Sequence, residues 1–452
     1  MKRFVFLFLA LCVLFCMTIY LDSRTEDISE ENNHTHYYNP ATCSQPEACF
    51  VCGLTRGVTL AHTFSFGKCT ECDTYSELDC PILIFSGDMS NMTTKKVVKK
   101  IEFEYRDKEK TFSGFAEIML QGSSSLSYAK KNYTIILYED QGFTKEMGIN
   151  VGWGNQSTYC LKANWVDKTH ARNVVTAKLV GEIQKSYGLL DIAPNNGAVD
   201  GFPVAIYING DFHGLYTMNI PKDTWMFGMD ENNPNHIVVS GGNWNDPVLF
   251  KEIPTDLADW EVEVGQENDE TLKKLQRLVE FVRDSSDEDF KNNFAQYLDL
   301  DATLNYYILL RYGWMPDNTG KNMLLVTYDG NVWYPSLYDL DSTWGVSWNG
   351  QELLSYKDTL LSCNSSRLWK RFSELYKEEI TDRYFELRST FLDTEYVMSK
   401  FNKFYNSIPQ EVLMYETQKW NTVETPIPGF PLSQIQEYLD SVVPRLDAEI
   451  NE

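Results

Sequence analysis

The chain has 452 residues, of which 43% are apolar and 14% aromatic, which is enough to build two or three globular domains and excludes a disordered chain. It carries 64 acidic against 40 basic side chains, a formal net charge of −24. This charge repels nucleic-acid phosphates and anionic membrane surfaces, so it argues against a DNA- or RNA-binding protein.

The N-terminus predicts export. Residues 1–21 begin with the basic MKR and continue in an apolar run from Phe4 to Leu21, about the length that crosses a bilayer. The run lacks a small-residue cleavage site, which favours an uncleaved membrane anchor over a signal peptide. The polar and acidic residues 22–42 are predicted to form a linker. We therefore expect an extracytoplasmic protein, secreted or anchored, that contacts the membrane only through its first segment.

Six cysteines between residues 43 and 80 predict a small Cys-rich module. Two C-x-x-C pairs separated by 16 residues have a spacing that brings four thiolates to one structural zinc ion: Cys49, Cys52, Cys69 and Cys72. Cys43 and His62 lie nearby as alternative ligands. A disulfide knot is the other interpretation, because exported proteins meet an oxidising compartment. The module resembles the zinc-ribbon-like modules of exported bacterial surface proteins, and a closed site would make it structural or adhesive.

From about residue 81 the pattern becomes that of strands. Apolar and polar residues alternate over 99–107, 115–122, 132–140 and 158–165. A helix is predicted over 171–187, and its apolar face contains Val174, Val175, Leu179 and Ile183. Two further strands, 202–208 and 213–220, are joined by Asn209-Gly210, the strongest short hairpin signal.

The second half of the chain is predicted to be mainly helical. Apolar residues recur at helical spacing from Leu272 to Val282 after an Asn268-Asp269 start, and further helices are expected over 304–314, 366–392 and 432–446. One isolated hairpin, 322–338, interrupts them. This order predicts an α+β fold of two parts, sheet-rich over about 81–255 and helical over about 256–450.

The stretch 311–345 gathers acidic and amide side chains around this hairpin. Asp317 and Asn322 lie on the loop before it, and Asp339 and Asp341 follow its second strand. Protein kinases use a D-x-x-x-x-N loop for a base and a magnesium ligand, then a hairpin, then a metal-binding Asp. Oxygen donors of this kind suit Mg²⁺ or Mn²⁺. The alternative interpretation is that these residues are ordinary turn and capping groups.

A phosphate-binding element is predicted in the sheet-rich half. Gly122, Ser123, Ser124 and Ser125 form a flexible turn with free backbone N–H groups between two strands. The basic residues that could reach a phosphate from this region are Lys130, Lys131, Lys162 and Arg172. The alternatives are a solvated polar hairpin and, for the arginine, a pairing with Asp167.

Four separated stretches, QGSSSLSYAKKNYTI, LKANWVDKTHARNVV, VAIYINGDFHGLYTM and DNTGKNMLLVTYDGNVWYPSLYDLDSTWG, together resemble the CotH family of spore-coat-type proteins with a two-lobed, protein-kinase-like fold. The resemblance covers residues 81–450. It implies an atypical exported kinase that uses ATP and a divalent metal to phosphorylate proteins, usually on serine. Asp317 would be its catalytic base, Asn322 and one or both of Asp339 and Asp341 its metal ligands, and the serine turn its nucleotide cover. The run Tyr216-Thr217-Met218-Asn219 departs from the pattern, which has a Glu there.

Two functions of different class follow. The first is an exported Ser/Thr protein kinase whose substrate is a basic, Ser-rich protein, since the chain itself is acidic. The second is a catalytically inactive kinase-like protein with a structural or adhesive role among cell-surface or spore-coat proteins. A metal-dependent phosphohydrolase would use similar carboxylates but needs no nucleotide clamp.

Overall fold

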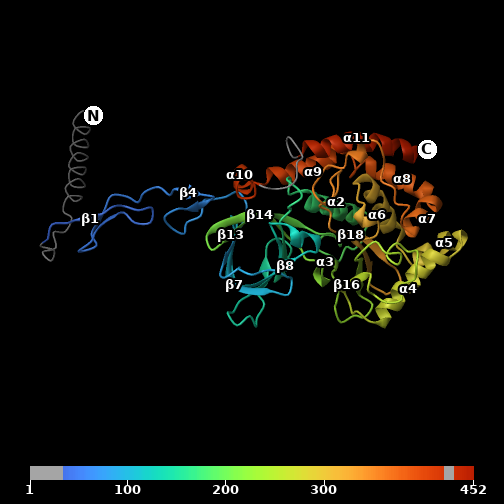
Figure 1. Cartoon of the computed structure of the whole chain (residues 1–452), viewed down its shortest axis with the longest axis horizontal. Helices are drawn as coiled ribbons and strands as arrows, with labels where there is room; N and C mark the ends of the chain where they lie inside the picture. The colour runs from blue at the N-terminus through green and yellow to red at the C-terminus, as the bar shows by residue number, and fades with distance from the viewer. Residues whose placement is uncertain (1–33, 422–431) are drawn as a thin grey trace, which may run out of the picture. The chain divides into compact units, whose positions relative to one another are not determined.

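The computed structural model describes residues 34–421 and 432–452, and the chain divides into two compact units, Met1–Ser76 and Glu77–Glu452 (Figure 1). The expected anchor or signal segment, residues 1–21, lies outside the described residues, as does most of the expected linker. Within the described residues, no helix combines the length and the apolar character needed to span a bilayer.

The first unit consists of short strands. Its strands are β1 Tyr38–Asn39, β2 Glu47–Cys49, β3 Thr55–Arg56, β4 Phe64–Ser65 and β5 Lys68–Cys69. The first three form one antiparallel sheet and the last two form a hairpin. Because β1 pairs with β2, the ordered unit begins before residue 43, where the sequence predicted the module to start. Cys80, the last cysteine of the predicted module, belongs to the second unit.

The second unit has a mixed α+β fold that opens with a closed barrel. Its strands are β6 Ile82–Ser86, β7 Val98–Arg106, β8 Thr111–Gln121, β9 Asn132–Tyr138, β12 Thr158–Lys162, β13 Gly201–Ile208 and β14 Asp211–Asn219. They follow the order β12-β14-β13-β6-β7-β8-β9, and β12 pairs with both β14 and β9 to close the ring. A two-stranded ribbon accompanies them: β10 Ile149–Asn150 and β11 Asn155–Gln156.

All six predicted strands form. In β9, for example, Tyr133, Ile135 and Leu137 are buried in the barrel core while their neighbours are half-buried, as period-two alternation requires. The Asn209-Gly210 hairpin joins β13 to β14, with both residues at positive φ. Closure into a barrel was not predicted, because alternation within a strand does not reveal which strands are neighbours.

A second sheet has the order β16-β15-β17-β18, and all its pairings are antiparallel. Its strands are β15 Ile237–Gly241, β16 Trp260–Val264, β17 Met323–Thr327 and β18 Tyr334–Leu337. The prediction of an isolated hairpin over 322–338 was therefore wrong, since β17 pairs with β15. The boundary predicted near residue 255 falls between β15 and β16, so this sheet spans it.

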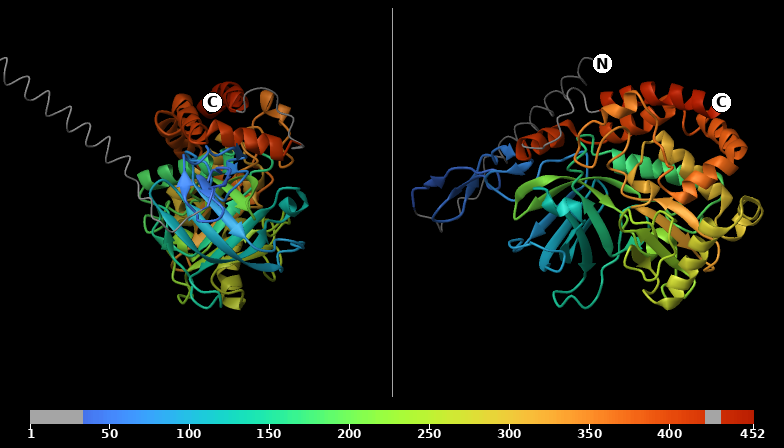
Figure 2. Two further views of the ribbon diagram at one scale, coloured as in Figure 1. Left: turned by 90° about the vertical axis from the view of Figure 1, so that its left-hand side faces the viewer. Right: turned by 45° about the vertical axis from the view of Figure 1, so that its right-hand side comes forward.

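The helices follow mainly in the second half of the chain. They are α2 Arg172–Ser186, α3 Thr224–Phe227, α4 Asp269–Asp284, α5 Asp287–Asn293, α6 Leu300–Tyr312, α7 Arg367–Leu375, α8 Lys377–Arg388, α9 Thr394–Asn406, α10 Gln410–Lys419 and α11 Ser433–Asn451. Figures 1 and 2 show α6, α7, α8 and α11 gathered beside one another, away from barrel strands β7 and β8. The helix α10 instead packs on β14. Four 3₁₀ turns complete the described elements: η1 Ser124–Ser127, η2 Phe294–Gln296, η3 Asp317–Thr319 and η4 Leu354–Lys357.

Helix starts agree with the capping signals in the sequence. The Asn268 side chain accepts hydrogen bonds from the backbone N–H groups of Glu270 and Thr271 at the start of α4. In α2, the predicted apolar face is buried, but so are Arg172, Asn173 and Thr176, so α2 is enclosed on nearly all sides.

A buried polar cluster fastens α10 to the barrel. The Lys130 ammonium donates to Glu416 Oε1 at 2.7 Å and to the Ala163 carbonyl at 3.1 Å, and Leu215 N–H donates to Glu416 Oε2 at 2.7 Å. His170, which is only 6% exposed, borders the same cluster, and its Nδ1 has no hydrogen-bond partner. The cluster tolerates one positive charge from Lys130 but provides no partner for a second.

We expect the free energy of unfolding to fall as the pH drops from 7 to 5. Burial, reinforced by the charge of Lys130, lowers the pKa of His170 to about 4, against about 6.5 in an unfolded chain. Between these values the unfolded state binds a proton that the folded state does not, so the stabilisation is complete above pH 6.5 and is lost toward pH 4. By pH 5 the loss from this group is about 2 kcal/mol.

Denaturant unfolding at pH 7 and pH 5 would measure this difference in the wild type and in His170→Asn. Asparagine tolerates the positive φ of 53° at this position. The variant should lose about 2 kcal/mol less between the two pH values. An equal loss in both proteins would show that His170 is not the titrating group.

Candidate active site

One cavity of about 360 Å³ brings together most of the predicted site residues. It lies among the barrel, the second sheet and the loops around them. The predicted residues that line it are Gly122, Ser123, Ser124, Ser125, Lys130, Lys162, Asp317, Asn322, Asp339 and Asp341. Lys131 and Arg172 are not among its lining residues.

The loop that carries Asp317 and Asn322 is held in place by the buried side chain of Asn318. Asp317 begins the turn η3, and Asn322 has a left-handed backbone with φ of 64°. Asn322 N–H donates to the Gly241 carbonyl at 3.1 Å. Between them, Asn318 is 2% exposed and donates to the Tyr338 carbonyl at 2.8 Å. Asn318 therefore ties this loop to the residue that immediately precedes Asp339.

Asp339 and Asp341 lie on either side of Leu340, which is anchored to α2 in the segment after β18. The backbone N–H of Leu340 donates to Asn173 Oδ1 of α2 at 3.1 Å, and the Leu340 side chain is buried. Asp339 itself has φ of 58°, an unusual backbone for a non-glycine residue. Such left-handed positions persist where the surroundings impose them, and they concentrate at functional sites.

Lys162 at the end of β12 is the cation that faces these carboxylates. Its Nζ lies 3.9 Å from Asp339 Oδ1, and its side chain is 13% exposed. Burial alone would lower the pKa of Lys162, but Tyr338, Asp339 and Asp341 oppose this effect and leave the pKa above its ordinary value. Lys162 therefore stays positively charged at neutral pH.

The pKa values of the neighbouring carboxyl groups are raised as well. Burial, and secondarily the charge of Asp339, raise the pKa of Asp341 to about 7, although Lys162 acts against the shift. Burial also raises the pKa of Asp317; Lys321 acts against this shift, and Asp339 adds a smaller contribution in the same direction as burial. Asp339 and Asp341 thus destabilise each other's charged form, and an added cation would relieve this effect. The lining also contains Lys321 and Lys222, and Lys222 pairs with Glu263.

The serine turn is shaped by residues around it. Gly122 has φ of +105°, which L side chains rarely adopt, and a Cβ at this position would lie 1.9 Å from Ser125 Oγ, so Ser125 would have to move. Asn132 donates to Ser125 Oγ at 3.3 Å and accepts from the Ala163 N–H at 2.7 Å, which links the turn to the end of β12. The Lys131 ammonium donates to the carbonyls of Leu126 and Tyr128 and so closes the turn from behind.

The other two predicted cations are already paired. Lys130 borders the cavity, but its side chain is 0% exposed and its ammonium is bound by Glu416. The Arg172 guanidinium pairs with Asp167 and also donates to Gln434 of α11. Among the four basic residues that the sequence offered, Lys162 is therefore the one whose charge faces the acidic groups.

Sequence reasoning missed several lining residues. Glu261 and Glu263 on β16 line the cavity, and Glu263 accepts from Ser240 Oγ at 2.6 Å and pairs with Lys222. The Lys222 ammonium also lies 4.6 Å from the centroid of the Tyr338 ring. The alternation W-E-V-E-V already indicates that the two glutamates share a face of a strand, but nothing in it indicates that this face borders the site.

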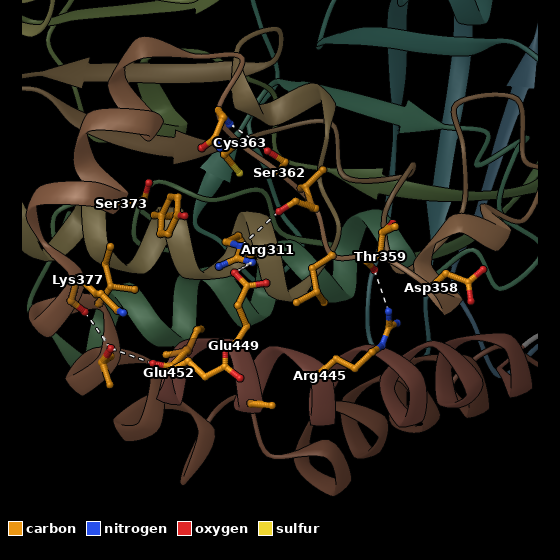
Figure 3. A pocket seen from close by; sticks show the side chains of 18 residues that line it. Arg311, Asp358, Thr359, Ser362, Cys363, Ser373, Lys377, Arg445, Glu449 and Glu452 are labelled. Carbon is orange, nitrogen blue, oxygen red and sulfur yellow. Dashed lines mark hydrogen bonds and ion pairs between the residues drawn. The ribbon is translucent and has the colours of Figure 1, made fainter.

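A larger cavity of about 940 Å³ lies elsewhere in the second unit (Figure 3). Its two arginines are occupied by neighbouring groups: Arg311 donates to Glu449 at 2.6 Å, and Arg445 donates to the Thr359 carbonyl at 3.2 Å. None of the predicted site residues lines it. Size alone therefore does not identify the active site here.

The predicted zinc ligands are distributed differently from the expectation. The structure places Cys49 and Cys52 with His34 and His36, whereas Cys69 and Cys72 lie with Cys43 and His62. The four thiolates of the two C-x-x-C pairs therefore do not meet at one ion. The eight cysteines of the described residues are all free thiols, so the structure also contains no disulfide knot in this part of the chain.

Comparison with protein families gives one match. A family model described as "CotH kinase protein" matches residues 118–452. The match begins within β8, so it is shorter at its start than the resemblance over 81–450 and leaves β6 and β7 outside. No curated protein matches the chain.

We expect Lys130 to be required for stability through its pairing with Glu416. Lys130→Met leaves Glu416 buried without a counter-charge and should lower the free energy of unfolding by about 3 kcal/mol. Glu416→Gln keeps an acceptor for the Leu215 N–H, so the double variant Lys130→Met/Glu416→Gln should regain at least half of the loss. Chemical denaturation of the three proteins would measure this, and strictly additive losses would contradict the pairing.

Proposed function

Because the chain belongs to the CotH kinase family, we propose that it is an ATP- and divalent-metal-dependent protein kinase. It transfers the γ-phosphoryl group of ATP to Ser or Thr hydroxyls of a protein substrate. The observation that carries this proposal is the clustering of Asp317, Asn322, Asp339 and Asp341 with Lys162 around one cavity.

The donor set fits Mg²⁺ or Mn²⁺. Asn322, Asp339 and Asp341 offer hard oxygen donors from two loops that Asn318 holds together. Burial and the charge of Asp339 disfavour ionisation of Asp341, and a bound cation would reverse this effect. When bound there, the metal supplies positive charge for the nucleotide phosphates.

The nucleotide phosphates would be bound by the serine turn and by Lys162. The turn offers backbone N–H groups, and Gly122 supplies the positive φ that this tight turn requires. Lys162 provides a fixed positive charge at the end of β12, directed toward Asp339. Positioning and electrostatics of this kind account for most of the catalysis of phosphoryl transfer.

Asp317 is the group we assign as the base. It lines the same cavity, and burial raises its pKa, which makes its carboxylate a better proton acceptor than an exposed aspartate. It would orient the substrate hydroxyl and accept its proton. Asn318 keeps Asp317 in position by bonding to the Tyr338 carbonyl.

The substrate we propose is a basic, Ser-rich protein outside the cytoplasm. The net charge of −24 favours a basic partner through electrostatic attraction. The apolar run Phe4 to Leu21 supports an extracytoplasmic location, at a cell surface or in a spore coat. The alternative is a structural or adhesive role without catalysis. The following experiment distinguishes this role from that of a kinase.

Incubation of the purified full chain with labelled ATP and Mg²⁺ or Mn²⁺ should label a basic Ser-rich peptide. A peptide of the same length with acidic residues in place of the basic ones should be labelled much less. Asp317→Asn should lower the rate about 100-fold or more, because the hydroxyl loses its proton acceptor. Asp358→Asn, which changes an exposed carboxylate at the other cavity, is the matched control and should keep wild-type activity.

The melting temperature with and without ATP and metal gives a second readout. Asp317→Asn should keep a nucleotide-induced rise in melting temperature while it loses transfer. Folded wild-type protein with neither labelling nor such a rise would reject the kinase and support the structural role.

A further inference from the structure

The first unit contains two groups of metal-ligating side chains that nothing in the kinase chemistry uses. We call them site A, formed by His34, His36, Cys49 and Cys52, and site B, formed by Cys43, His62, Cys69 and Cys72. Each residue offers one ligand atom, and the four ligand atoms of each group lie within 4.8 Å of one another. Each group therefore has the number and kind of donors that a closed tetrahedral zinc site requires.

The distances within each group match the edges of such a tetrahedron. With ordinary zinc bond lengths, two sulfur ligands lie roughly 3.8 Å apart, and a sulfur and a nitrogen ligand lie roughly 3.6 Å apart. The sulfurs of Cys43 and Cys69 are 3.7 Å apart in site B. His34 Nε2 lies 3.4 Å from Cys49 Sγ in site A, and His62 Nδ1 lies 3.5 Å from Cys72 Sγ in site B. A disulfide would instead need a separation of about 2.05 Å.

The backbone around each C-x-x-C pair is shaped for metal binding. After Cys52, Gly53 adopts φ of 74° and donates its N–H to the Cys49 carbonyl at 2.8 Å, which closes a tight turn. The Cys49 N–H in turn donates to the Leu54 carbonyl at 2.8 Å. The Cys69 N–H donates to the Thr74 carbonyl at 2.8 Å, an equivalent return of the chain after the second pair. Both turns hold their two thiols on one side of the chain.

The first unit also lacks an apolar core that could replace these sites. Among residues 34–76, the buried residues are Cys43, Cys49, Gly67 and Cys69. Large apolar side chains of this segment, such as Phe50, Val58 and Leu60, are instead 64%, 82% and 59% exposed. A segment this short rarely folds on apolar burial alone, and small domains of this kind depend on metal ions or disulfides. Here the interior consists of the ligands themselves.

We propose that residues 34–76 bind two zinc ions, one at site A and one at site B, and that these ions hold the unit folded. Site A is a Cys₂His₂ site and site B a Cys₃His site, and both are structural because all four positions are filled by protein. The sites interleave in the sequence, since Cys43 of site B lies between the histidines and the cysteines of site A. Loss of either ion therefore loosens a segment that the other site also uses.

The metal content of the purified full chain tests this proposal. After dialysis against a weak chelator, elemental analysis should give two zinc ions per chain. His36→Ala should lower the content to one, as should His62→Ala, because each removes one ligand from a different site. Cys80→Ser changes the cysteine of the same cluster that lies in the second unit, and it should keep two.

Three results would overturn the proposal. One zinc per chain that is unaffected by His36→Ala and lost in Cys49→Ser and Cys69→Ser would indicate a single four-thiolate site. No metal together with fewer than ten free thiols in the denatured chain would indicate disulfides, since the sequence has 10 cysteines. Iron in place of zinc would reject the assigned metal.

Removal of the metal provides a readout that does not depend on any variant. A strong chelator should make the backbone amides of residues 34–76 exchange hydrogen rapidly, because zinc binding and folding of such a unit are coupled. The amides of the barrel strands should keep their protection, since their core is apolar. Unchanged exchange in residues 34–76 after complete zinc removal would show that the ions do not hold the unit folded.

Discussion

The candidate site depends on two neighbouring carboxyl groups, Asp339 and Asp341, that the fold holds in one desolvated cavity. Asp339 and Asp341 share a partly desolvated cavity with Asp317, and Lys162 is the lysine that faces them. Burial, and secondarily repulsion from Asp339, raise the pKa of Asp341 to about 7. Burying neighbouring carboxyl groups costs stability, so the surrounding chain must hold them in place. The left-handed backbone at Asn322 and Asp339 shows where this constraint is concentrated.

Three amide side chains, two of them buried and one half-buried, provide that constraint. Asn318, Asn173 and Asn132 each bond to backbone groups of a neighbouring element and so connect the base loop, the segment after β18, helix α2 and the serine turn. Each is a short side chain with little freedom to lose, so its hydrogen bonds fix position at a small entropic cost. Two buried ion pairs, Lys130–Glu416 and Arg172–Asp167, join the barrel and α2 to neighbouring parts of the chain.

Much of this arrangement was predictable from local patterns, and the failures share one cause. Alternation predicted the strands, the Asn209-Gly210 turn predicted a hairpin, and the spacing of Asp317, Asn322, Asp339 and Asp341 predicted residues that line one cavity. Each of these is a property of a short segment. The closure of the barrel, the pairing of β17 with β15, and the choice of Lys162 over Lys130 depend on contacts between distant segments. Glu416, which neutralises Lys130, lies 286 residues away in the sequence.

The cysteines also show that local sequence patterns do not reveal contacts between distant segments. Two C-x-x-C pairs at a suitable spacing are as compatible with one ion bound by four thiolates as with two separate ions. The spacing limits which ligands can come together but does not determine which of them bind the same ion. His34 and His36 decide between these alternatives; they precede Cys43 and lie in a segment whose polarity resembles that of a linker. Because β1 pairs with β2, these histidines lie beside Cys49 and Cys52 in site A. Cys43 then completes site B. Two interleaved sites then fix a chain segment that has almost nothing apolar to bury, whereas the kinase-like unit relies on its apolar core.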